Sequence, residues 1–391
     1  MTEVSRRVRA ADVAFAPVTD FYFRSRYAQR RFEQGIADFT FGNPHEMPLD
    51  GFVSALGDAA IPMDKDWFAY KTSEDEPRAF LAEHVGPELG LVFEPEDFAL
   101  TAGAFGAIAL AFRLILDAGD EAVFCEPAWF CYEPMLLAAD AVPRKVRLDP
   151  ARFDLDLAAI EAAITAKTRL VIVNTPHNPT GRIYDAESLR ALAELLDLAS
   201  ARIGRRIFLL SDEPYRRLRF DGRDFTSPAT LYPWTLISYS YGKILLTPGQ
   251  RLGYLAMSPL MPNETRKAIR EATFAAQMAL GWTFPSALMQ HALPALESLS
   301  IDQAALARRR DRLVPALAGA GYRPLEPEGT FYLFSRWPEG DPEVAWNRLA
   351  DHDVFVLPGS ILAAPDHFRI SLTASDAMVE QGLRAFGEAV E

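Results

Sequence analysis

Short apolar runs alternate with stretches of helical periodicity between about residues 98 and 257. The apolar runs are brief and rich in β-branched or aromatic residues, which predicts strands at 98–100, 121–125, 170–174, 207–211, 236–240 and 254–257. Between two of these runs, residues 185–200 place four leucines at the spacing of one helix face: Leu189, Leu192, Leu195 and Leu196. Strands that alternate with helices favour an α/β fold with a largely parallel sheet covered on both faces.

Two further helices have sequence features that mark where they begin. The stretch 104–116 follows the small residues Thr101-Ala102-Gly103, and 156–164 opens with Asp156, whose side chain can cap a first helical turn. The C-terminal part has a different pattern, with a helix at 304–317 and strands at 329–334, 354–357 and 368–371. This pattern predicts a smaller α+β unit.

Length, composition and charge narrow the class of protein. At 391 residues the chain is long for one core and fits two domains, and 49% hydrophobic with 24% charged residues is ordinary for a soluble enzyme. A net charge of −13 argues against a nucleic-acid partner, because phosphates would be repelled. The chain start has no signal-like apolar core, no run is long enough to span a membrane, and two cysteines make no disulfide framework. We therefore expect a cytoplasmic protein without a membrane partner.

Polar residues follow the ends of three predicted strands. Asn178 comes after 170–174, Asp212 ends 207–211, and Ser240 and Lys243 follow 236–240. Ligands of parallel sheets bind beyond the carboxyl ends of the strands. We therefore expect these side chains to converge on one binding site.

Lys243 is the strongest candidate for chemistry. Most lysines are solvated surface charges, but the run Ser240-Tyr241-Gly242-Lys243-Ile-Leu-Leu is an apolar setting for one. A free lysine has a pKa of about 10.4, and a neighbouring cation or partial burial lowers it enough to free the amine for attack. With Ser240 before it and Arg251 eight positions after it, Lys243 suits an aldehyde cofactor that carries a phosphate.

A second group of residues offers an anion site. Gly103, Ala104 and Phe105 stand at a strand-to-helix turn, where free N–H groups and the helix dipole favour a phosphate. Arg251 adds a guanidinium fork, and Ser240 adds a hydroxyl. The six histidines show no metal-ligand spacing, so we expect no metal, and His177 is interpreted as a turn residue.

The ordered set of motifs resembles the class I and II aminotransferases that depend on pyridoxal 5′-phosphate (PLP), the family typified by aspartate aminotransferase. The motifs are Asn174-Thr-Pro-His-Asn-Pro-Thr-Gly181, Ser211-Asp-Glu-Pro-Tyr215, Ser240-Tyr-Gly-Lys243, Arg251 and Phe368-Arg-Ile-Ser-Leu372. The resemblance extends from about Phe39 to the C-terminus and implies the type I PLP fold. It also implies that an N-terminal segment, 1–45, packs with a small domain, 291–391, beside a large PLP-binding domain, 46–290.

The resemblance assigns cofactor roles to individual residues. Lys243 would form a Schiff base with PLP and then move the α-proton, while Asp212 would hold the pyridine nitrogen protonated. Asn178 and Tyr215 match donors to the phenolic oxygen of PLP. Trp129, with Phe130 and Tyr132 as neighbours, matches the aromatic residue that stacks on the ring. A core tryptophan, a turn asparagine and a helix-capping aspartate are the competing interpretations.

The resemblance also assigns substrate and subunit contacts. Arg369 would bind the substrate α-carboxylate, assisted by Asn178 and by the backbone of Gly42. Tyr70 would reach the phosphate of the neighbouring subunit, which predicts a homodimer with its active site at the subunit interface. Phe105 departs from the family pattern, because a polar residue is common there, so one phosphate contact is in doubt.

The sequence therefore predicts an aminotransferase of amino acid metabolism or biosynthesis, which moves an amino group between an L-amino acid and a 2-oxo acid through pyridoxamine phosphate. A lyase, decarboxylase or cyclising enzyme on the same fold is the alternative, and a non-catalytic regulatory module is a remote one. The substrate stays open. Arg24, Arg26, Arg30 and Arg31 are the candidates for a second carboxylate, whereas several aromatic residues hint at an apolar side-chain site: Phe21, Tyr22, Phe23, Phe39, Trp282 and Phe284.

Overall fold

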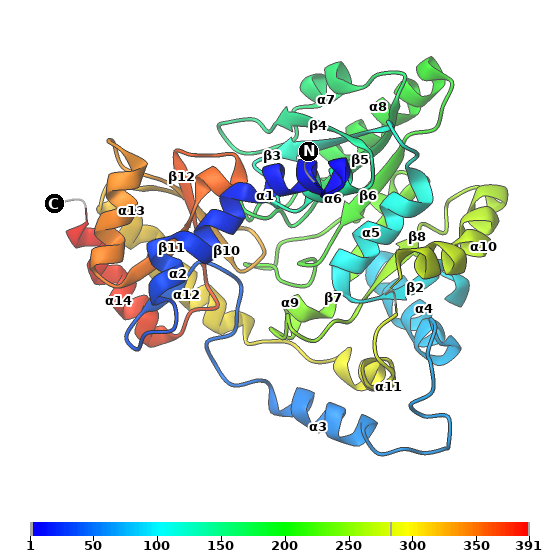
Figure 1. Ribbon diagram of the computed structural model, residues 1–391, viewed down its shortest axis with the longest axis horizontal. Coiled ribbons are helices and arrows are strands. Elements are labelled where there is room, and N and C mark those ends of the chain that lie inside the picture. Colours follow the sequence, from blue (N-terminus) through cyan, green and yellow to red (C-terminus); the bar gives the residue numbers. More distant parts are fainter. Residues whose placement is uncertain (1–2, 282–283, 390–391) are drawn as a thin grey trace.

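A computed structural model describes residues 3–281 and 284–389 of the chain. Figure 1 shows two sheets in separate parts of the molecule, with the N-terminal helix lying between them. The larger sheet has the strand order β2-β8-β7-β6-β5-β3-β4. Its strands are β2 (Phe98–Thr101), β3 (Glu121–Glu126), β4 (Val142–Arg147), β5 (Thr168–Asn174), β6 (Phe208–Asp212), β7 (Thr235–Ser240) and β8 (Gly253–Met257).

This sheet is parallel apart from β8, which runs antiparallel to both of its neighbours. Alternate residues of β5 enter different cores. Leu170 and Ile172 pack with α5 (Gly103–Ile115) and α10 (Asn263–Leu280), whereas Val171 and Val173 pack with α7 (Leu157–Ala163) and α8 (Ala186–Ile203). A sheet with helices on both faces needs apolar side chains on both, which is why its strands read as continuous apolar runs. The predicted α/β class is confirmed.

Strand β4 was not predicted from the sequence. It lies at the edge of the sheet and reads Val-Pro-Arg-Lys-Val-Arg, and Val146 is its only fully buried residue. Charged residues and proline are typical of an edge strand, because one row of its backbone groups faces solvent. The pattern that identifies buried strands therefore does not apply to it.

The smaller sheet has the order β1-β11-β12-β10-β9. Its strands are β1 (Ala37–Phe39), β9 (Arg323–Leu325), β10 (Tyr332–Arg336), β11 (Val354–Pro358) and β12 (His367–Ser371), and α12 (Gln303–Gly319), α13 (Pro342–Asp351) and α14 (Asp376–Glu388) accompany them. β1 pairs in parallel with β11, so part of the N-terminal segment belongs to this sheet. α1 (Arg6–Arg24) instead packs against α6 (Tyr132–Ala138) of the larger part. The exact domain division at residues 45 and 290 stays a prediction.

β10 begins later than the predicted strand 329–334. Gly329 and Thr330 form a turn against the larger part, and Thr330 has a left-handed φ of 68°. The Thr330 N–H donates to the carbonyl of Leu218 (2.9 Å), and a Cβ on Gly329 would lie 2.8 Å from that same oxygen. The glycine is thus required by a close contact between the two parts of the chain.

Glycines also let β8 and α5 approach one another. A Cβ on Gly253 would lie 2.3 Å from the carbonyl oxygen of Tyr239 and 2.8 Å from the Cα of Gly103. This contact brings the end of β7 next to the first turn of α5.

The remaining helices connect or flank these layers: α2 (Arg26–Arg30), α3 (Asp50–Ala59), α4 (Asp75–Leu89), α9 (Tyr241–Ile244) and α11 (Ala287–Leu296). The predicted cap of Asp156 is present, since its side chain accepts from the N–H of Ala159, and Asp185 caps α8 in the same way by accepting from the N–H of Ser188. Across the described part of the chain, no helix combines the length and apolar character needed to cross a membrane.

Candidate active site

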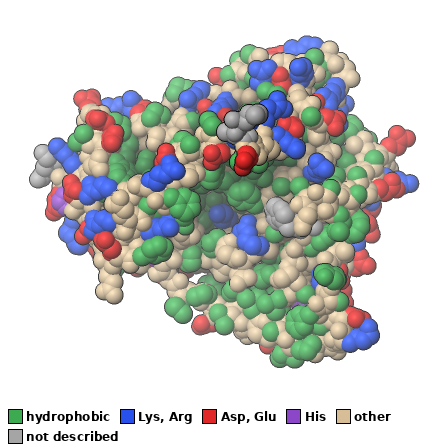
Figure 2. Space-filling model, in the orientation of Figure 1, with side chains coloured by type: hydrophobic (Ala, Val, Ile, Leu, Met, Phe, Trp, Pro, Cys, Tyr) green, Lys and Arg blue, Asp and Glu red, His purple; other side chains and the backbone are tan. Residues whose placement is uncertain are grey.

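A cavity of about 230 Å³ lies at the carboxyl ends of β5, β6 and β7. Figure 2 shows a hollow in the face between the two parts of the molecule, with hydrophobic side chains around it and basic ones within it. The residues that line the cavity come from six separate segments: Ala104, Phe105, Ile108, Trp129, Phe130, Cys131, Asn174, Asn178, Asp212, Pro214, Tyr215, Ser240, Gly242, Lys243, Pro248 and Arg251. The convergence expected from the strand ends is therefore present.

Asp212, the last residue of β6, is a buried carboxylate with one free oxygen. Its Oδ2 accepts from the hydroxyl of Tyr132 at 2.5 Å and, more weakly, from the amide of Asn174 at 3.4 Å. Its Oδ1 has no hydrogen-bond partner among the described residues. Burial raises the pKa of Asp212 to about 6, although contacts with Tyr132 and Ser238 and the charge of Lys243 act in the opposite direction. The free oxygen marks where a cationic N–H group would fit.

Lys243 stands beside this carboxylate. It is the third residue of the short helix α9 and is half-buried. Its Nζ lies 5.6 Å from the ring centre of Tyr215 and 5.8 Å from that of Phe331. An amine over two aromatic faces, within electrostatic reach of Asp212, is placed to react with a ligand in the cavity.

Asn178, which lines the cavity, is joined to Arg369, which lies behind that lining, and the pair links the two parts of the chain. The N–H of Asn178 donates to the side-chain oxygen of Asn174 (2.7 Å). Arg369, on β12, donates to the side-chain oxygen of Asn178 (2.8 Å) and to the carbonyl of Thr40 (2.9 Å). Its guanidinium lies 3.7 Å from the ring centre of Tyr332, and its Nε has no partner in the described part of the chain. Arg369 is only 2% exposed, so an anion is its natural partner.

Two tyrosine hydroxyls meet near this arginine. Burial raises the pKa of Tyr215 well above its usual value. Burial acts on Tyr332 in the same way, but the charges of Arg369 and Lys243 outweigh it and lower the pKa of that hydroxyl. Sequence analysis did not single out Tyr332, although its position in an apolar strand after a glycine turn was visible. The prediction that Tyr215 belongs to the site agrees with its place in the cavity lining.

The turn at the start of α5 forms a cradle for an anion. Gly103 has a φ of 73°, and a Cβ there would lie 2.6 Å from a terminal nitrogen of Arg251. The other terminal nitrogen of Arg251 donates to the carbonyl of Pro248 (2.6 Å), which holds the guanidinium against the turn. Ser240 ends β7 beside it, and Ala104 lines the same cavity. Free helix N–H groups, a guanidinium and a hydroxyl together suit a phosphate.

The opposite wall of the cavity is apolar. The ring of Phe105 meets that of Trp129 edge to face at 4.8 Å, and Trp129 meets Tyr132 in the same way at 5.3 Å. Cys131 is buried there, and burial raises the pKa of its thiol. A flat ring placed between this wall and Tyr215 would contact aromatic surface.

Several predicted residues lie elsewhere. Tyr70 is fully exposed and lines a different cleft, with Phe68, Met278 and Phe284. Gly42 is packed behind the cavity, where a Cβ would lie 2.5 Å from Phe331 and 2.8 Å from the hydroxyl of Tyr332.

His177 is a buried turn residue, in line with its interpretation from the sequence. Its ring forms a hydrogen bond with the side chain of Thr180, and burial lowers the pKa of His177 to about 3. Among the residues that the structure describes, no group of three or more His, Cys, Asp or Glu side chains could hold a metal ion.

The N-terminal arginines are bound outside the cavity. Arg24 pairs with Asp20, Arg26 with Asp351 and Arg30 with Asp353, while Arg31 lies over the ring of Tyr22. Of the aromatic candidates for a side-chain site, Phe21 and Phe39 are buried in the core, Phe23 is on the surface, and Phe284 lies beside Tyr70. Trp282 lies outside the described residues.

One cavity of the α/β sheet thus holds a lysine, a buried carboxylate with a free oxygen and an anion cradle. These groups suit an aldehyde cofactor that carries a phosphate. The family model "Aminotransferase class I and II" matches residues 35–386. The chain belongs to this family, and its members depend on PLP. The predicted class of enzyme, aminotransferase, is thereby confirmed.

Relatives and solved structures agree with this assignment. The chain is 32% identical to an aspartate/prephenate aminotransferase of Thermus thermophilus, over 99% of this chain and 98% of that protein. It is 30% identical to mouse kynurenine–oxoglutarate transaminase 1, over 77% of this chain and 73% of that one. Among solved structures, an amino transferase of Eubacterium rectale superimposes with a TM-score of 0.86 at 28% identity, covering 99% of this chain and 96% of the other.

We expect the buried carboxylate of Asp212 to make the stability of the PLP-free protein depend on pH. The folded pKa of about 6 lies above the usual value of 3.8. Protonation therefore favours the folded state, and this contribution is lost as the pH rises from about 4 to about 6, by a total of about 3 kcal/mol. Urea unfolding of wild type and Asp212→Asn across this pH range measures the contribution. As the pH rises, the urea concentration at the wild-type unfolding midpoint should fall relative to that of the variant.

The exposed carboxylate of Asp20, 57% exposed, provides the control. Asp20→Asn should follow the wild-type pH dependence throughout. If the unfolding midpoints of wild type and Asp212→Asn changed in parallel with pH, the carboxylate would not be held in a dehydrated environment.

Proposed function

We propose that this chain transfers an amino group between an L-amino acid and a 2-oxo acid, with PLP attached covalently to Lys243. The observation that carries these residue roles is the meeting of three features in one cavity: the amine of Lys243, the free oxygen of Asp212 and the cradle formed by Gly103 and Arg251. The sheet brings the ends of its strands together, and the three groups found there suit the aldehyde, the pyridine nitrogen and the phosphate of one ligand.

PLP, when bound, supplies an aldehyde and an electron-withdrawing pyridine ring. The amine of Lys243 would hold the cofactor through that aldehyde. Its Nζ lies 5.6 Å from the ring centre of Tyr215, where it could take a proton from the α-carbon of the substrate and return it to a neighbouring carbon.

Asp212 and the anion cradle fix the two ends of the cofactor. The free Oδ1 of Asp212 would accept the N–H of the pyridinium, while Tyr132 and Asn174 hold the other carboxylate oxygen in place. Gly103 and Arg251 would hold the phosphate, together with Ser240 and the backbone of Ala104 and Phe105. Asn178 and Tyr215 would contact the phenolic oxygen, and Trp129 would lie against the ring.

Arg369 receives the α-carboxylate of the substrate. The carbonyl of Thr40 holds one terminal nitrogen, and Tyr332 supports the guanidinium from below. An arriving carboxylate replaces the side-chain oxygen of Asn178 on the other terminal nitrogen. A fixed carboxylate would set which α-bond is aligned for cleavage, and so would favour removal of the α-proton over loss of the carboxylate. The backbone of Gly42, next to Tyr332, borders this position.

The amino donor carries an apolar or aromatic side chain. Lys243 and Arg251 are the only basic side chains among the described residues that line the cavity, and both have a cofactor role in this proposal. The N-terminal arginines are paired with carboxylates or rings elsewhere. Trp129 has a cofactor role as well, so the side chains of Phe105, Ile108 and Phe130 form the apolar wall that remains. Relatives are named for both aspartate and kynurenine, and this wall favours the aromatic type of substrate.

The active site is shared by two copies of the chain, which work as a homodimer in the cytoplasm. Tyr70 is completely exposed, and exposed apolar side chains lie nearby in the sequence or in the same cleft: Met63, Phe68 and Met278. A second copy that covers this surface could receive the Tyr70 hydroxyl at its own phosphate cradle. The cysteines Cys125 and Cys131 are both free, which suits a reducing compartment.

Replacement of Lys243 by alanine should abolish turnover, by a factor of about 10⁴ or more, because the covalent link and the proton carrier are lost together. Lys267→Ala, at a lysine that is 76% exposed, should leave the rate unchanged. Borohydride reduction of the PLP-loaded protein followed by peptide mass analysis should find the cofactor on Lys243 in wild type. Comparable turnover in Lys243→Ala, or an adduct on another residue, would refute the assignment.

Replacement of Phe105 by alanine tests the substrate class. Removal of this ring from the apolar wall should lower kcat/KM for aromatic donors about 10- to 200-fold and change that for alanine little. Wild type itself should prefer aromatic or aliphatic donors to aspartate. Phe23→Ala removes a ring that is 68% exposed and should not alter this ranking. A wild-type preference for aspartate would contradict the proposed substrate class.

Mixing two inactive variants tests the shared site. If Tyr70 acts across the interface, a hybrid dimer of Tyr70→Ala and Lys243→Ala has one site with both defects and one intact site. Unfolding and co-refolding of an equal mixture should then restore about a quarter of the wild-type activity. Each variant refolded alone is the control. No recovery, with hybrids verified by mass, would place Tyr70 in its own subunit's site or in none.

A further inference from the structure

Two consecutive arginines follow Tyr215 and bind the same carboxylate beneath the cavity. The Nε of Arg216 donates to Oε1 of Glu88 (2.9 Å), and the Nε of Arg217 donates to Oε2 (3.0 Å). Glu88 lies in α4, far away in sequence. Burial alone would raise the pKa of Glu88, but the two arginines lower it to about 2. Glu88 therefore stays charged and fixes the segment that carries Tyr215.

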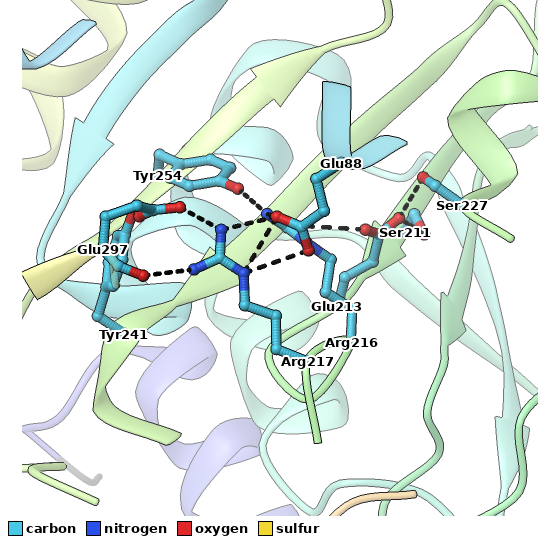
Figure 3. Close-up of polar contacts among 9 residues, drawn as sticks. All are labelled: Glu88, Ser211, Glu213, Arg216, Arg217, Ser227, Tyr241, Tyr254 and Glu297. Atoms are coloured by element: carbon cyan, nitrogen blue, oxygen red, sulfur yellow. Dashed lines mark hydrogen bonds and ion pairs between the residues drawn. The ribbon is translucent and has the colours of Figure 1, made fainter. Parts of the chain in front are cut away.

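Arg217 also binds a second carboxylate, which lies at the C-terminal end of α11. Its terminal nitrogen donates to Oε1 of Glu297, the residue that caps α11. The other oxygen of Glu297 accepts from the hydroxyl of Tyr241. Figure 3 shows Glu297 between Arg217 and Tyr241, with Glu88 on the other side of the arginine. The side chains thus form a continuous series, Glu88–Arg217–Glu297–Tyr241, called here the Arg217 network.

Tyr241 is the first residue of α9, the helix that carries Lys243. α9 has four residues, too few to hold its own direction in water, so contacts with the rest of the chain must orient it. Backbone bonds tie it at both ends, from the N–H of Tyr241 to Leu252 and from the N–H of Ile301 to the carbonyl of Ile244. The Tyr241 hydroxyl adds a side-chain anchor on the outer side of the helix. Tyr241 is 1% exposed, so its hydroxyl needs this acceptor.

Arg216 supports the strands that lead into α9. Its side chain is fully buried and donates to the hydroxyl of Tyr254 on β8 (2.6 Å). Its guanidinium lies 4.1 Å from the ring centre of Tyr239 on β7. Arg216 also lies 3.8 Å from a third buried carboxyl group, that of Glu213, and burial raises the pKa of Glu213 to about 7. A buried ion-pair cluster of this kind is a rigid support, because the loss of one member leaves a buried charge unpaired.

We propose that the Arg217 network positions Lys243 for bond formation with the cofactor, by joining α9 through Tyr241 and Glu297 to the segment that carries Tyr215. Tyr241, Glu297 and Arg217 are positioning residues that touch neither cofactor nor substrate. This inference rests on the proposed role of Lys243. The inference adds that the Arg217 network holds both Lys243 and Tyr215, and that the direction of the Lys243 Nζ depends on this network.

Tyr241→Phe tests the inference by removing a single hydroxyl. The rate at which PLP-free protein forms the borohydride-trappable link at Lys243 should fall about 10- to 100-fold, and kcat should fall by a similar factor, because a displacement of about 1 Å has effects of this size. KM should stay near the wild-type value, since Tyr241 does not touch the substrate. Glu297→Gln removes the charge that joins Arg217 to Tyr241 and should give the same pattern.

Tyr232→Phe is the matched control. Its hydroxyl is also buried and donates to a backbone carbonyl, that of Ile207 (2.6 Å), away from α9. The thermal midpoint should fall in both tyrosine variants, but capture of PLP and kcat should fall only in Tyr241→Phe. Equal capture rates in the two variants would overturn the inference. If Tyr241→Phe does not fold, Glu297→Gln decides in the same way.

The experiment separates this inference from the proposed function. A wild-type protein that yields no trapped PLP at Lys243 would refute the role of the lysine itself. A wild-type protein that traps PLP there, with Tyr241→Phe and Glu297→Gln indistinguishable from it, would refute only the positioning role.

Discussion

The site depends on a carboxylate that is kept away from water. Asp212 ends a strand buried on both faces, and its free oxygen would cost free energy in an empty apolar interior. The protein stabilises the other oxygen with Tyr132 and Asn174 and leaves Oδ1 for a cation in the cavity. Burial that raises the pKa of the free carboxylate also strengthens its pairing with a pyridinium, because the same low dielectric acts on both. In the proposed arrangement, the cofactor and the carboxylate would therefore stabilise one another's charged forms.

The sheet explains why the other groups lie within reach of this carboxylate. β5, β6 and β7 are adjacent and parallel, so Asn174, Asp212 and Ser240 leave the sheet at the same edge. The antiparallel strand β8 begins beside the end of β7, where Gly253 pairs with Ser240, and Arg251, just before β8, lies against Gly103 in the cradle. Only residues without a Cβ allow this contact, and two glycines, Gly103 and Gly253, face each other there. Close backbone contacts thus form the part of the site proposed for the phosphate, whereas side chains form the part proposed for the ring.

Much of this arrangement could be predicted from the sequence, for a physical reason. Strands that are buried on both faces must be apolar throughout, so the sequence pattern identified them. The residues at the ends of these strands could then be taken directly from the sequence. β4 could not be found in this way, because an edge strand with solvent on one side has no such pattern. The predicted start of β10 was wrong, because Gly329 is required by a contact with Leu218, which is distant in sequence. Tyr332, Glu88 and Glu297 were missed for the same reason: their roles arise from partners that only the folded chain brings near.

The two parts of the chain meet through Arg369, and this has a consequence for catalysis. The arginine belongs to the smaller sheet, yet its acceptors are Asn178 of the larger part and Thr40 of the N-terminal segment. A substrate carboxylate that takes the place of Asn178 on the guanidinium exchanges one contact between the two parts for a contact with the ligand. Lys243 is held from the opposite side, through α9, by α4 and α11. With the roles proposed for Arg369 and Lys243, substrate binding would act on the side of the smaller sheet, while the reacting amine would stay attached to the larger part. That separation would allow the substrate to be fitted to the cofactor without moving the lysine.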